Sequence, residues 1–176
     1  MKPMIKERVS MFKGLRFDVE RVTVEARGRT FQRDVVVFPQ SSVILPLLDD
    51  RRALFLSQYR APINDYIFEV PAGVVNPGET PLEAAKRELV EETGYEASSW
   101  QYLGSFYPVP GYSTELMHFF VARGLRHVGA RPEPYELIEV QEVEMSDALG
   151  MLKGGEIKDM KTALAILLWT TLKGHA

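Results

Sequence analysis

The segment 73–94 constrains this chain most strongly, because it concentrates carboxylates on one predicted helix. Thr80 suits the N-cap position, and Glu83 three residues later completes a capping box that satisfies backbone N–H groups of the first turn. Pro81 fits the first helical position, and the glycine at the end of the segment tolerates the left-handed conformation that follows a last turn. We therefore predict a helix over residues 81–93.

The acidic residues of this helix share one face. At about 100° per residue, Glu88, Glu91 and Glu92 fall within an arc of about 100°. Arg87 precedes Glu91 by one turn and can pair with it. A solvated helix face is the simpler alternative, but too few basic residues lie nearby to offset the repulsion between the carboxylates. A hard divalent cation, Mg²⁺ or Mn²⁺, would relieve it by taking carboxylate, carbonyl and water oxygens. The adjoining stripe is apolar and should pack on a sheet: Leu82, Ala85 and Leu89.

Residues 73–95 resemble the Nudix box, which reads Gly-x5-Glu-x7-Arg-Glu-aliphatic-x-Glu-Glu-x-Gly and ends on an aliphatic or aromatic residue. Each fixed position of that motif is filled. The Nudix superfamily hydrolyses nucleoside diphosphates linked to another moiety. The resemblance implies these metal ligands: Glu88, Glu92, the carbonyl of Ala72, and Glu91 as a ligand or a support. It also implies that Arg87 orients the carboxylates and that Glu79 is mainly structural.

The segments that flank the box resemble the ADP-ribose pyrophosphatase branch of this superfamily: 58–60, 69–73, 108–115 and 136–140. This resemblance implies hydrolysis of ADP-ribose to AMP and ribose 5-phosphate by metal-activated water. It implies these substrate-side residues: Arg60, Glu69, Gly111, Tyr112 and Ser113. An ordinary Pro/Gly turn is the alternative for 111–113. For Glu69 and Glu115 the alternative to a substrate contact is a plain loop carboxylate.

The catalytic base is expected in the loop before a predicted strand at 137–143. The resemblance implies that an acidic residue there acts as the base or binds a further metal. Glu136 is our first assignment, and Glu133 and Glu139 are the alternatives, because one sequence does not fix the register of this loop. The residues leave other substrates open: GDP-mannose, NADH or a diadenosine polyphosphate. They also leave open a non-catalytic sensor of nucleotide sugars.

Composition restricts the partners. The chain has 176 residues, of which 45% are hydrophobic and 26% charged, so it can bury one sizeable core. A net charge of −3 without a basic stripe argues against a nucleic-acid partner. The chain contains no cysteine, which is compatible with the cytoplasm, where we expect the protein. Its most apolar tract, 163–169, is too short to span a bilayer.

Strand and helix patterns predict an α+β fold, in agreement with the Nudix α/β/α sandwich. We predict a hairpin from 17–26 and 30–38 and a second strand pair from 43–48 and 53–57. Further strands are expected near 100–107, 116–123 and 137–143, and helices near 146–153 and 158–172. The resemblance implies an N-terminal β-hairpin subdomain (1–40) before a hydrolase domain (41–176). It also implies that the subdomain is exchanged across a homodimer, with 16–33 at the interface and near the partner's adenine.

Overall fold

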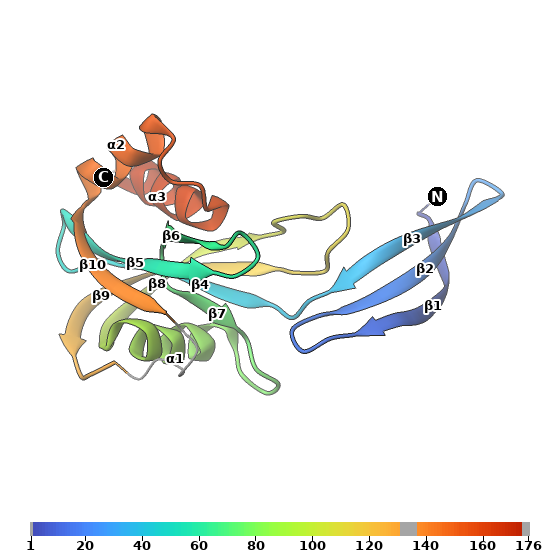
Figure 1. Ribbon diagram of the computed structural model, residues 1–176, viewed down its shortest axis with the longest axis horizontal. Coiled ribbons are helices and arrows are strands. Elements are labelled where there is room, and N and C mark those ends of the chain that lie inside the picture. Colours follow the sequence, from blue (N-terminus) through green and yellow to red (C-terminus); the bar gives the residue numbers. More distant parts are fainter. Residues whose placement is uncertain (1, 131–136, 174–176) are drawn as a thin grey trace.

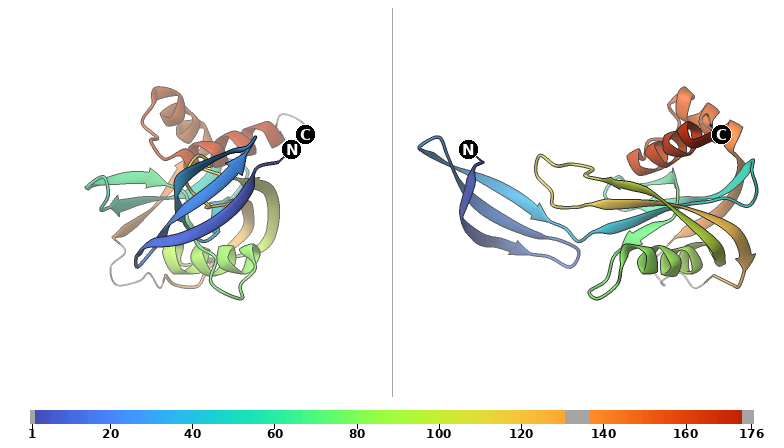
Figure 2. Two further views of the ribbon diagram at one scale, coloured as in Figure 1. Left: turned by 90° about the vertical axis from the view of Figure 1, so that its right-hand side faces the viewer. Right: turned by 180° about the vertical axis from the view of Figure 1, so that it is seen from behind.

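The computed structural model describes residues 2–130 and 137–173 of the chain. An N-terminal sheet projects from a larger body, as Figure 1 and both views of Figure 2 show. This sheet has three antiparallel strands in the order β1-β2-β3. Their bounds are Met4–Lys13 for β1, Asp18–Ala26 for β2 and Arg29–Val37 for β3.

The predicted hairpin is confirmed, but the sheet contains one more strand than the sequence indicated. Strands β2 and β3 pair from Asp18 opposite Val37 to Ala26 opposite Arg29. Strand β1 was not predicted, because the run Lys6-Glu7-Arg8 interrupts the alternation of apolar and polar residues. It nevertheless pairs along its length with β2, and its side chains are exposed.

The body contains two sheets between helices, which confirms the predicted α+β sandwich (Figure 1). The first sheet has the order β7-β4-β9-β8, with β4 (Ser41–Pro46), β7 (Ala72–Val74), β8 (Tyr95–Phe106) and β9 (Met117–His127). The second has the order β10-β5-β6, with β5 (Arg52–Arg60), β6 (Asp65–Glu69) and β10 (Ile138–Glu144). Helix α1 (Pro81–Thr93) covers one side, and α2 (Met145–Gly154) and α3 (Met160–Lys173) cover the other.

The prediction that 43–48 and 53–57 form a strand pair is wrong. Strand β4 lies between β7 and β9, whereas β5 lies between β10 and β6. The two strands share an isolated bridge between Leu47 and Ala53, where the chain passes from one sheet to the other. Buried side chains from both sheets and from α2 and α3 join in one apolar cluster, which includes Phe55, Phe119 and Ile166. Local sequence patterns identify such strands but not their partners.

Helix α1 has the predicted bounds and caps. The Thr80 hydroxyl accepts a hydrogen bond from the Glu83 N–H at 3.3 Å, and the Glu83 carboxylate accepts one from the Thr80 N–H at 2.7 Å. Gly94 ends the helix in the left-handed conformation, with φ 76° and ψ 16°. Ala85 and Leu89 are fully buried in a second apolar cluster against the first sheet, with Leu82 beside them. This packing turns the acidic face of α1 toward β7.

Candidate active site

A pocket of about 390 Å³ lies where the acidic face of α1 meets β7 and the start of α3. It brings together predicted site residues from three separate parts of the chain: Arg60, Ala72, Arg87, Glu88, Glu91 and Glu92. The sequence missed further residues of its lining, above all Asp159 and Lys161 at the start of α3. The pocket therefore has an acidic wall from α1 and a mixed wall from β5 and α3.

Arg87 organises the acidic wall. Its guanidinium donates to Glu79 Oε1 at 2.8 Å, to Glu88 Oε1 at 2.6 Å and to Glu91 Oε2 at 2.9 Å. It also donates to the carbonyl of Val74 at 2.8 Å. These bonds raise the pKa of Arg87, above all through Glu79, so its positive charge is secure. The predicted contact between Arg87 and Glu91 is present, and one cation faces several carboxylates.

Glu88 packs against the backbone of β7 at Gly73, where the carboxylate occupies the space that a Cβ would fill. A Cβ built on Gly73 would lie 1.9 Å from the carboxyl carbon of Glu88. Because real Cβ contacts essentially never fall below 3.0 Å, any side chain at this position would displace the carboxylate. Glu88 is 9% exposed, so it is held between β7 and Arg87.

Glu92 lies one turn further along α1 and is 3% exposed. Its Oε2 accepts a hydrogen bond from the Ala72 N–H at 2.9 Å. Ala72 itself pairs with Val43 of β4, so the sheet fixes the backbone beside this carboxylate. The structure thus brings Glu92 and the backbone of Ala72 into direct contact.

The donors of the acidic wall suit a hard divalent cation. Carboxylate and carbonyl oxygens are the ligands that Mg²⁺ and Mn²⁺ prefer, and three glutamates face a pocket that also contains Ala72. Within residues 2–130 and 137–173, no three acidic or histidine side chains converge on one point that a metal ion could fill. Glu88 and Glu91 instead bond to Arg87. Binding of a metal would exchange part of these hydrogen bonds for metal–oxygen bonds.

The mixed wall from β5 and α3 contains two cations that are hydrogen-bonded to one buried carboxylate. Arg60 donates to Glu69 through two parallel hydrogen bonds of 2.7 and 2.6 Å, and Lys161 also bonds to Glu69. Glu69 is 0% exposed and is not among the residues that line the pocket, and its contact with substrate stays a prediction. Burial alone would raise the pKa of Glu69, but Arg60 and Lys161 lower it below its ordinary value.

Lys161 was not predicted, although a local signal precedes it. Asp159 stands directly before α3, and its carboxylate accepts a hydrogen bond from the Thr162 N–H at 3.0 Å, as an N-cap residue does. The same carboxylate accepts a bond of 3.0 Å from Lys161. An Asp-x-Lys-Thr segment at a helix start identifies the cap. Nothing in it indicates a partner 92 residues earlier in the chain.

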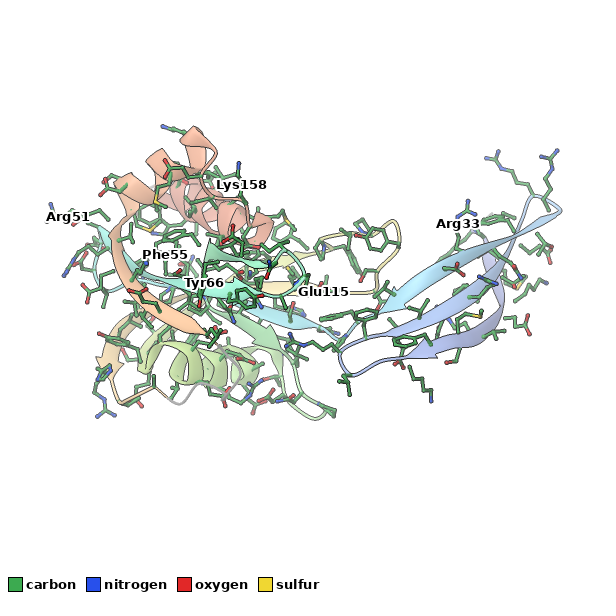
Figure 3. All side chains as sticks on the ribbon, viewed as in Figure 1. Arg33, Arg51, Phe55, Tyr66, Glu115 and Lys158 are labelled. Carbon is green, nitrogen blue, oxygen red and sulfur yellow. The ribbon has the colours of Figure 1, made fainter. Side chains whose placement is uncertain are left out.

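Glu115 and Arg16 extend the lining toward the N-terminal sheet. Figure 3 shows Glu115 on the side of the body that faces this sheet, with Arg33 far out on the sheet. Burial raises the pKa of Glu115, although a 2.9 Å hydrogen bond from the Ser41 hydroxyl and the charge of Lys161 oppose the rise. Arg16 belongs to the connection between β1 and β2, so the N-terminal sheet contributes a residue to the pocket of its own chain.

The predicted residues Gly111, Tyr112 and Ser113 lie in the connection between β8 and β9, which contacts the end of β3. The Val36 N–H donates to the Tyr112 carbonyl at 2.7 Å, and Val36 and Ser113 form a parallel bridge. Tyr112 is 57% exposed. This connection ties the N-terminal sheet to the body, and its place beside the terminal ribose stays a prediction.

The expected base falls partly outside the described residues, since Glu133 and Glu136 belong to the gap at 131–136. Glu139 lies in β10 and is exposed. It lines a different pocket of about 490 Å³, together with Ser57 and Tyr66. Tyr66 is labelled in Figure 3. The assignment among these three glutamates stays a prediction.

Comparison with known proteins identifies the family of the chain. Residues 38–164 match the NUDIX domain. The chain therefore belongs to the Nudix hydrolase family. Among its relatives, the ADP-ribose pyrophosphatase of Bacillus subtilis is 35% identical over 167 residues, which cover 94% of this chain and 90% of the relative.

One further relative and one solved structure extend the comparison. The methanol dehydrogenase activator of Bacillus methanolicus is 35% identical over 141 residues, which cover 79% of this chain and 76% of that protein. A solved structure of an ADP compounds hydrolase superposes with a TM-score of 0.88 at 24% identity. That superposition covers 100% of this chain and 97% of the other and confirms the fold. In the two described ranges, no helix is both long and apolar enough to cross a membrane.

Proposed function

We propose that this chain hydrolyses the pyrophosphate bond of ADP-ribose and releases AMP and ribose 5-phosphate. The observation that carries the proposal is the pocket itself, which is lined both by the carboxylates of α1 and by the cations Arg60 and Lys161. A pyrophosphate needs cations along its oxygens, and a metal that binds it needs carboxylates on the far side. The similarity to a relative named ADP-ribose pyrophosphatase favours this substrate.

In the proposed reaction, Glu88 and Glu92 would hold Mg²⁺ with help from Glu91 and the Ala72 carbonyl. A metal held there would supply an activated water and neutralise phosphate charge. Arg87 keeps the carboxylates oriented through the bonds described above. Arg60 meets the phosphate oxygens, for which a planar guanidinium is suited. Gly111, Tyr112 and Ser113 are proposed to shape the space for the terminal ribose.

Glu136 is proposed to take the proton of the attacking water. A glutamate carboxylate within hydrogen-bond reach of the water can act in this way. Separate Glu133→Gln, Glu136→Gln and Glu139→Gln variants test the assignment, because loss of the base lowers kcat while ADP binding persists. Full turnover in Glu136→Gln would move the role to one of the other two glutamates.

Product analysis tests the substrate. The purified protein is incubated with ADP-ribose, GDP-mannose, NADH and a diadenosine polyphosphate, each with Mg²⁺ and with a chelator. The proposal expects AMP and ribose 5-phosphate from ADP-ribose, fastest of the panel and only with metal. Faster cleavage of another member would overturn the substrate assignment, and tight binding without cleavage would favour a sensor.

We also propose that residues 1–40 act as a dimerisation subdomain of the hydrolase domain 41–176. The N-terminal sheet exposes large apolar side chains, among them Met4 and Phe12 at 55% each, and it buries Val22 at 4%. A three-stranded sheet with so much exposed apolar surface gains stability from a second copy. Light scattering at micromolar concentration should show a homodimer. A monomer would remove the exchanged subdomain as a source of adenine contacts.

A further inference from the structure

Glu69 is the centre of a charge cluster that the Nudix box does not contain. Its side chain is 1% exposed and accepts two hydrogen bonds from Arg60 and one from Lys161. A carboxylate is rarely buried to this degree unless it is paired and hydrogen-bonded. Both of its cationic partners line the pocket that the acidic face of α1 also lines.

This arrangement places charges of opposite sign on long side chains around one cavity. The negative charge of Glu92 already acts on Arg60. Arginine and lysine side chains have many rotamers, so cations in such a cavity can turn toward any carboxylate within reach. Arg87 lies on α1 itself and already bonds directly to Glu88 and Glu91, so further cations at these carboxylates would compete with it and with a metal.

The hydrogen bonds around Glu69 keep Arg60 and Lys161 from turning toward the α1 carboxylates. Arg60 uses Nε and Nη2 for its two parallel bonds, which fixes the plane of the guanidinium and the direction of its third nitrogen. Lys161 is held from two sides, by Glu69 and by Asp159. The Thr162 hydroxyl donates a hydrogen bond of 2.6 Å to the Asp159 carboxylate. The same hydroxyl accepts a hydrogen bond of 2.8 Å from the Val70 N–H.

We propose that Glu69 is a positioning residue that holds Arg60 and Lys161 in the wall opposite the acidic face of α1. It thereby keeps a positive side for phosphate oxygens apart from a negative side for the metal. The assignment of phosphate oxygens to the positive side rests on the proposed function. The separation of the two charged walls does not.

Binding of ADP and of Mn²⁺, each measured by calorimetry, tests the proposal on Glu69→Gln. Without the buried charge, Arg60 and Lys161 turn toward the α1 carboxylates, so both ligands should bind more weakly. A loss of at least about tenfold is expected for ADP in the presence of Mg²⁺, because two ordered cations are withdrawn from it. Glu142→Gln is the matched control, since Glu142 pairs with Arg52 on the exposed side of β10.

A triple variant separates positioning from general damage to the fold. Adding Arg60→Met and Lys161→Met to Glu69→Gln removes the competing cations, so Mn²⁺ affinity should return at least to that of the unaltered protein, while ADP binding stays weak. A triple variant that keeps the Mn²⁺ defect would overturn the proposal. So would a folded Glu69→Gln protein that binds both ligands within twofold of the unaltered chain.

If Glu69→Gln does not fold, Glu69→Asp retains the charge with one carbon less and should shift both affinities in the same direction by a smaller factor. Unchanged affinities in that variant would then contradict the proposal. None of these measurements needs turnover. Failure to cleave ADP-ribose would overturn the proposed function and leave the role of Glu69 to be decided by binding.

Discussion

Replacing Gly73 by alanine should damage the metal site while sparing the fold. The added Cβ would lie 1.9 Å from the carboxyl carbon of Glu88, and contacts below 3.0 Å are essentially never observed. The carboxylate must therefore retreat by about 1.1 Å, the difference between these two distances. It is the far end of a flexible side chain, so it can move at a small cost to the free energy of unfolding.

The cost to catalysis should be much larger. A displacement of about 1 Å in a catalytic group can lower the rate about 100-fold, which corresponds to about 2.7 kcal/mol of activation free energy. Moving Glu88 also breaks its 2.6 Å hydrogen bond with Arg87, which holds the acidic wall together. We expect a fall of about 100-fold in kcat with Mg²⁺ and weaker Mn²⁺ binding.

The assay compares kcat, Mn²⁺ affinity and the urea midpoint of Gly73→Ala with those of the unaltered protein. Gly150→Ala is the control, because a Cβ on this α2 residue meets nothing within 4 Å. That variant should keep full activity. If Gly73→Ala binds Mn²⁺ normally and loses less than fivefold in kcat, Glu88 is not a ligand and the reasoning from its contact with β7 is wrong.

Three further predictions concern α1 and its loop. Glu92→Gln should leave the fold intact and reduce Mg²⁺-dependent turnover at least about 100-fold, and near-normal turnover would exclude Glu92 as a ligand. Hydrogen bonds from Arg87 lower the pKa of Glu79 from 4.5 to about 2. The stabilisation from this pair is therefore complete above about pH 4.5 and is lost as the pH falls through about 2. Urea titrations should accordingly show that Glu79→Gln destabilises the protein at pH 7 and has little effect at pH 2. Thr80→Ala removes the N-cap bond and should cost about 1 kcal/mol in the free energy of unfolding, and an unchanged urea midpoint would contradict the capping role.

The sequence was most informative where the determinants are local. The bounds of α1 follow from Thr80, Pro81 and Gly94, which act within one turn of each helix end, and the structure reproduces them. The short strands β6 and β7 escaped detection, because Pro71 interrupts the segment and leaves too few residues for a period-two pattern.

The rest depends on contacts between distant residues. The sequence indicated that Glu69 contacts the substrate. In the structure it is buried and bonds to Lys161, which lies 92 residues away in the chain. Nor do local signals show that β4 pairs in parallel with β9, which places Ser41 opposite Met117. The acidic half of the site was therefore predictable from one helix and Arg60 from the family resemblance, whereas Asp159 and Lys161 required the fold.

Lys161 lies near the start of α3, and this position determines when the pocket is complete during synthesis. During synthesis the N-terminal elements emerge first, and long-range contacts form slowly because distant segments must meet. The carboxylates of α1 are made about midway through the chain, but the pocket lacks Asp159 and Lys161 until α3 docks against the sheets. A nascent or truncated chain that ends before residue 160 would contain the entire acidic motif and still lack a complete pocket. The complete pocket therefore forms late in folding, after α3 has docked.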